Sequence, residues 1–113
     1  MVTRYSFCPD QAAKVAAHKT AKRHLRKVAK CLGITLQPGD LRTSPGGPII
    51  WGESILHTDH VYVQVEPSRE HVLVRTCKSR RDFTGGTNMY IPLALLSKPE
   101  VFAAHLQSIL ELA

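Results

Sequence analysis

Basic side chains recur at close intervals in one stretch near the start of the chain. Within residues 19–30 they are separated by one or three positions: Lys19, Lys22, Arg23, Arg26, Lys27 and Lys30. On a helix these spacings put all six on one face, about one turn apart. Cations in such a row can contact successive phosphates of a nucleic-acid backbone and release the counterions bound there. The pattern therefore predicts a phosphate-binding surface whose affinity depends on salt and little on base sequence.

A second basic group stands much later, in a loop that also contains two glycines. Lys78, Arg80 and Arg81 belong to it, and they would add phosphate contacts if the loop lay on the same side as the first group. Two other interpretations of the first group stay open: a solvated face, or a surface that docks an acidic protein as an adaptor or inhibitor. Binding to a membrane surface is disfavoured, because the apolar side of the helix would be mostly alanine rather than Trp, Phe and Leu.

Histidine and cysteine side chains in the middle of the chain form a further reactive set. His57, Asp59, His60 and Cys77 include good zinc ligands, but no standard zinc spacing joins them. A nucleophile–base pair of Cys77 and His60 can be drawn on paper, as it can for most small proteins. Neither the carboxylate spacing of a metal-dependent nuclease nor a P-loop is present in the sequence. We therefore expect no metal, no cofactor and no enzymatic activity.

Tyr62 and Arg75 are expected to face each other across a hairpin. Such a pair could offer a stacking platform for single-stranded bases. A cross-strand cation–π pair, or a face covered by a helix, is the favoured interpretation, because the aromatic pattern of RNA-binding sheets is absent.

The first basic group lies in a segment with strong helix signals. Residues 9–32 are rich in alanine and lysine and contain neither glycine nor proline after Pro9, which favours a helix. Gly33 follows as the expected left-handed C-cap. An apolar arc opposes the basic one at the helical period: Ala13, Ala17, Ala21, Leu25, Val28 and Leu32. We expect this narrow arc of small residues to lie close against a sheet.

Alternating valines predict a β-hairpin in the second half of the chain. Residues 60–66 and 71–77 flank a four-residue loop, and this register pairs Val63 with Val74 and Tyr62 with Arg75. All five valines of the hairpin then share one face: Val61, Val63, Val65, Val72 and Val74.

Weaker signals surround the hairpin. Residues 49–57 are interpreted as one strand bent at Gly52, and residues 88–93 as an edge strand, because Pro92 cannot donate to a ladder. Residues 35–48 are interpreted as a connection, and residues 99–112 carry an apolar stripe typical of a helix.

These elements predict an α+β fold in a single domain, residues 1–113. It comprises an N-terminal basic helix, a three- or four-stranded antiparallel β-meander and a C-terminal helix. Both helices are expected to cover the valine face. The other face would be open or committed to self-association, which would allow a homodimer.

The net charge of +6 is unevenly distributed along the chain. Residues 1–30 hold eight basic residues and one acidic residue, whereas residues 31–113 hold seven and eight. This asymmetry favours a polyanionic partner.

The three cysteines form no disulfide framework, and no apolar run has the length of a signal peptide or a membrane span. We expect a cytoplasmic, non-enzymatic nucleic-acid-binding accessory protein without a membrane partner; docking to an acidic protein surface is the alternative.

Overall fold

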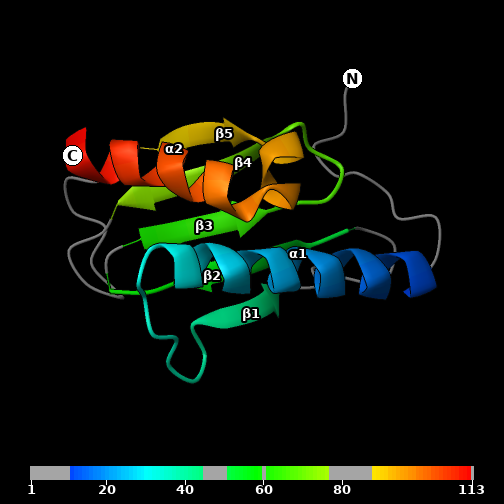
Figure 1. The fold of residues 1–113 in the computed structure, drawn as a ribbon. Helices are drawn as coiled ribbons and strands as arrows, with labels where there is room; N and C mark the ends of the chain where they lie inside the picture. Colours follow the sequence, from blue (N-terminus) through cyan, green and yellow to red (C-terminus); the bar gives the residue numbers. More distant parts are fainter. Residues whose placement is uncertain (1–10, 45–50, 60, 77–87, 113) are drawn as a thin grey trace.

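The computed structural model describes residues 11–44, 51–59, 61–76 and 88–112, which form two helices packed on one side of a sheet (Figure 1). A short 3-10 helix, η1, precedes the second α-helix. The elements in chain order are α1 (Gln11–Cys31), β1 (Leu41–Ser44), β2 (Glu53–His57), β3 (Val61–Val65), β4 (His71–Thr76), β5 (Asn88–Pro92), η1 (Leu93–Ser97) and α2 (Pro99–Leu112). This is the predicted α+β class, with five strands rather than three or four.

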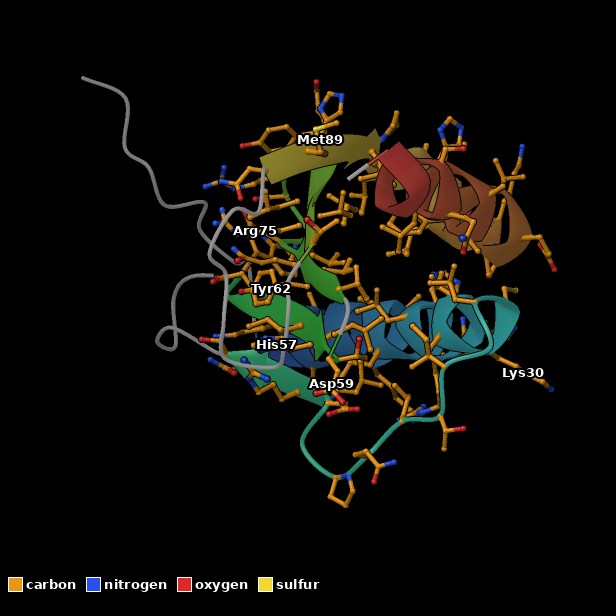
Figure 2. The ribbon with its side chains drawn as sticks, turned by 90° about the vertical axis from the view of Figure 1, so that its left-hand side faces the viewer. Lys30, His57, Asp59, Tyr62, Arg75 and Met89 are labelled. Atoms are coloured by element: carbon orange, nitrogen blue, oxygen red, sulfur yellow. The ribbon has the colours of Figure 1, made fainter. Side chains whose placement is uncertain are left out.

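The sheet is an antiparallel meander in which the strands lie in chain order, β1-β2-β3-β4-β5. In the central hairpin Val63 pairs with Val74 and Tyr62 with Arg75, which confirms the predicted register. The five valines of this hairpin are buried beneath the helices. Because side chains alternate across a strand, Tyr62 and Arg75 lie on the opposite face (Figure 2).

The core lies between that valine layer and the inner sides of the helices. Leu25 and Val28 of α1 and Phe102 and Leu106 of α2 are fully buried in it, and Ile109 packs against it. The helices run side by side in roughly the same direction (Figure 1). The prediction that both cover the valine face is confirmed.

The end of α1 forms the predicted glycine cap. Gly33 has a φ of 74°, in the left-handed region. Its amide donates to the Lys30 carbonyl over 3.0 Å, and the Ile34 amide donates to the Ala29 carbonyl over 2.9 Å. These two bonds define a Schellman motif, which stops the helix and turns the chain toward β1.

The inner stripe of α1 differs from the predicted arc in its first half. Lys14 and His18 are buried, whereas Ala13 and Ala17 are only half-buried. The helix is therefore rotated so that polar residues, rather than alanines, face the sheet there. Polar partners on β2 and the segment before it, described below, explain the burial of His18.

The strand β1 lies in the stretch interpreted as a connection, so that interpretation is wrong for residues 41–44. Its residues pair with β2, Leu41 with Leu56 and Ser44 with Glu53. Gly52 has a φ of 70°, but Trp51 and Gly52 precede β2, which begins at Glu53, so the predicted strand does not run through these two residues. The preceding residues 49–50 lie outside the described residues.

The strand β5 is an edge of the sheet, as predicted. Pro92 lies opposite His71, so the next residue, Leu93, lies opposite Glu70. The Leu93 amide donates to the Glu70 carbonyl over 2.8 Å, which makes these two residues a hydrogen-bonded pair. Because hydrogen-bonded and non-bonded pairs alternate, the nitrogen of Pro92 faces outward. The proline therefore removes no bond from the ladder.

The second face of the sheet is not open along its whole width. Tyr90 on β5 is exposed, but Ile55 and His57 on β2 are buried. The expectation of an uncovered face is therefore wrong at β2. A homodimer through this face stays a prediction.

Candidate functional site

The predicted basic residues of α1 form one row on the side of the helix that faces away from the sheet. Lys22 is half-exposed, and the other five are exposed: Lys19, Arg23, Arg26, Lys27 and Lys30. Lys30, at the far end of the row, extends away from the body of the domain (Figure 2). From Lys19 to Lys30 the row is about 16 Å long, at 1.5 Å per residue.

The row carries a concentrated positive charge. In the part of the chain that the structure describes, none of the six cations lies within 4.0 Å of a carboxylate; the salt bridge found there joins Arg69 to Glu66 at 3.4 Å, in the β3–β4 turn. No carboxylate of the described residues therefore neutralises the charge of the row.

The second basic group cannot be placed relative to this row. Lys78, Arg80 and Arg81 lie outside the described residues. The same holds for His60 and Cys77, on which the metal and nucleophile interpretations depended. Among the described residues no group of three or more His, Cys, Asp or Glu side chains could hold a metal ion, and Cys31 is an exposed free thiol.

His24 lies within the same stretch of α1 and is half-buried at the edge of the row. Burial lowers the pKa of its imidazole below the ordinary value of 6.5, and the positive charges of Arg23 and Lys27 lower it further. Both effects disfavour the protonated ring. The His24 ring beside the cations therefore favours its neutral form more than a free imidazole does.

A cleft of about 230 Å³ opens on this flank of α1, between the helix, η1 and the β3–β4 hairpin. Three polar residues belong to its lining, Thr20, His24 and Ser97. The remaining lining residues are aliphatic: Ala17, Ala21, Val65, Pro67, Leu93, Ala94 and Leu96. Sequence reasoning did not find this cleft. The small residues at positions 17 and 21, opposite the larger apolar residues of η1, were the available signal.

A histidine and a serine meet inside the domain, where α1 crosses β2. The His18 ring lies 2.7 Å from the Ser54 hydroxyl through Nδ1, and Nε2 bonds the Trp51 carbonyl. Because a carbonyl only accepts, Nε2 carries a proton. A serine–histidine pair can act as nucleophile and base, but Ser54 is 0% exposed and His18 5%. No substrate can reach this pair in the folded state, and it serves to fasten the first half of α1 to the sheet.

The pair predicted on the second face, Tyr62 and Arg75, is present but engaged with neighbours. The Tyr62 hydroxyl donates to Gln64 over 2.9 Å, and the Tyr62 and His57 rings form a T-shaped contact with a centroid distance of 5.2 Å. The Arg75 guanidinium donates to Asn88 over 2.8 Å. Burial, more than the nearby charges, raises the pKa of Tyr62. The half-buried Tyr62 ring is therefore a poor stacking platform.

Within the described residues, neither helix is both long and apolar enough to cross a membrane. The chain matches no protein-family model, no curated protein and no solved structure.

Proposed function

We propose that the protein binds nucleic acid through the phosphate backbone, using the outer face of α1. The observation that carries this proposal is the row of six basic residues, of which five are exposed and Lys22 is partly exposed, with no carboxylate within 4.0 Å among the described residues. A row of this kind fits a polyanion whose charges also repeat at short intervals.

The cost of the row to the helix supports a functional role. Four pairs of like charges stand at i,i+4: Lys19–Arg23, Lys22–Arg26, Arg23–Lys27 and Arg26–Lys30. Each such pair destabilises a helix by about 0.2–0.5 kcal/mol. A bound polyanion relieves this repulsion. The packing of α1 on the sheet does not require the row of like charges.

The composition of the face favours phosphates over an acidic protein. Protein interfaces centre on buried apolar and aromatic anchors, whereas interfaces with nucleic acid are more polar and more positive. The large apolar residue on this side of α1 is Val15, 63% exposed and one turn before the row. The row itself has no aromatic residue.

The proposed role is binding without catalysis, in a small accessory protein. The serine–histidine pair among the described residues is sealed in the core, as shown above. Phosphate contacts along one helix supply affinity and little base specificity.

A fluorescence-anisotropy titration with labelled single- and double-stranded DNA and RNA tests the proposal, at about 50 and 200 mM salt. We compare the wild type with two triple variants of equal net charge. Arg23→Gln, Arg26→Gln, Lys30→Gln removes three charges from the row. Ala104→Glu, Gln107→Glu, Ser108→Glu adds three negative charges on the exposed side of α2.

We expect the α1 variant to bind roughly tenfold or more weakly than the α2 variant, with a shallower dependence on salt. Circular dichroism and urea unfolding confirm that both variants are folded. Equal losses in the two variants would show that net charge matters and position does not. The absence of wild-type binding at low salt to all four nucleic acids would refute the proposal.

A further inference from the structure

The cleft beside the basic row has a position that the row alone does not explain. His24 lines it, and the charges of Arg23 and Lys27 act on that ring. Arg23 directly precedes His24 in α1 and Lys27 follows it by about one turn, so both cations stand on the helix beside this part of the cleft. A phosphate held by Arg23 or Lys27 would bring the sugar and base of its own nucleotide to the entrance of the cleft.

The lining of the cleft matches the two surfaces of a nucleobase. A base has apolar faces and a hydrogen-bonding edge, and it stacks on aromatic rings, including histidine. The aliphatic walls and the His24 ring suit the faces. The hydroxyls of Thr20 and Ser97 suit the edge, since each can donate and accept. Ser97 already donates to the Ala94 carbonyl over 3.0 Å, so toward a ligand its oxygen is an acceptor.

A larger hollow elsewhere on the molecule has the wrong charge for this task. It has a volume of about 630 Å³ on the second face of the sheet, near the β3–β4 turn, and contains Glu66 and Glu70 as well as Arg69. Two carboxylates disfavour an approaching phosphate, and the α1 row lies on the opposite side of the sheet.

We propose that the cleft between α1 and η1 takes one unpaired base of a single-stranded segment whose phosphates lie on Arg23 and Lys27. This inference rests on the proposed function and narrows its substrate to single-stranded nucleic acid. A duplex presents no such base unless it unpairs one, which costs a few kcal/mol. Single strands are therefore bound more tightly than duplexes of equal length.

The test compares three short ligands by anisotropy: a single-stranded oligonucleotide, its duplex, and a strand of equal length that lacks every base. The variant Ala94→Trp fills the cleft from η1, and Thr20→Trp fills it from α1. The matched control Ala104→Trp adds the same side chain to an exposed position of α2 that does not line the cleft. Urea unfolding verifies that each variant is folded.

For the wild type and Ala104→Trp, we expect removal of the bases to weaken binding roughly five- to hundredfold, the range of stacking one base. For Ala94→Trp and Thr20→Trp, strands with and without bases should bind alike. The His24 ring resonances should shift on adding the strand with bases and much less on adding the strand without them.

Equal wild-type binding of strands with and without bases would overturn the inference while leaving phosphate binding intact. If the wild type bound none of the nucleic acids, the proposed function and the inference would both be overturned. A titration with an acidic, tryptophan-containing peptide gives a second result that would contradict the inference. In that case the wild type binds the peptide and Ala94→Trp does not, while base-dependent binding of nucleic acid is the same in both. That outcome would assign the cleft to a protein partner.

Discussion

The two helices cover the same layer of valines, yet their outer sides have little in common. On the inner side, Leu25 of α1 and Leu106 of α2 are both fully buried. On the outer side, α1 carries six basic residues. Among the α2 residues whose burial is described, the exposed ones are of mixed kinds: Glu100, Val101, Ala104, His105, Gln107 and Ser108. Burial explains what the helices share, and α2 shows that a helix can cover this sheet without a charged row.

Substitutions on the buried inner sides of the two helices should have the largest effect on the free energy of unfolding. Phe102→Ala should destabilise the domain by about 3–5 kcal/mol and Leu25→Ala by about 2–5 kcal/mol, because each leaves a cavity in the core. Urea unfolding monitored by circular dichroism measures both. The exposed controls Arg26→Ala and Ser108→Ala should stay within about 0.5 kcal/mol of the wild type. A large loss for Arg26→Ala would mean that the row is needed for folding.

A smaller effect is expected where the inner side of α1 departs from that of α2. Ser54→Ala removes the partner of the buried His18 Nδ1, which should cost about 1–3 kcal/mol. The double variant Ser54→Ala, His18→Leu removes both polar groups. Its loss of stability should therefore be smaller than the sum of the losses of the single variants Ser54→Ala and His18→Leu. Additive losses in urea unfolding would contradict the pairing.

Removing a single charge from the outer side of each helix should change the salt dependence of binding for α1 only. Lys30→Gln on α1 should reduce the slope of log affinity against log salt by about 0.7–0.9, since one phosphate contact is lost. Lys98→Gln, an exposed lysine directly before α2, should leave the slope unchanged. Anisotropy titrations over a salt series measure both slopes, and equal slopes for the two variants would remove the distinction between the helices.

The smallest effect concerns His24. Its pKa should lie below 6.5 in the free protein, because of burial first and of Arg23 and Lys27 second. The folded state thus prefers the neutral ring, so this group makes the fold slightly less stable as pH falls below 6.5. Phosphates bound to Arg23 and Lys27 should raise this pKa, which NMR titration of the ring measures. An unchanged value in the saturated complex would place the phosphates elsewhere.

Much of the fold could be predicted because strong local periodicity agrees with it. The valine alternation predicted the register of β3 and β4, and the glycine at position 33 predicted the end of α1. The strand β1 could not be predicted in this way. Its sequence, Leu41-Arg42-Thr43-Ser44, is short and mostly polar, and its pairing with β2 is a tertiary contact.

Within the candidate site, too, only the part that follows from a local sequence pattern could be predicted. The basic row follows from helical spacing alone, so its placement could be predicted from residues 19–30. Burial of His18 depends on Ser54 and Trp51, which lie more than thirty positions away in the chain. The cleft likewise joins Thr20 to Ser97, and no local pattern connects those residues.

Amide chemical-shift mapping by NMR can show which residues of α1 contact a bound strand. The isotope-labelled protein is titrated with a short single-stranded oligonucleotide at low salt. We expect progressive, saturable shifts at Lys19–Lys30, while the exposed α2 residues Ala104, His105, Gln107 and Ser108 remain unaffected. Shifts confined to α2 or to the Tyr62 face of the sheet, or no shifts at all, would contradict the assignment of the outer face of α1 as the phosphate-binding surface.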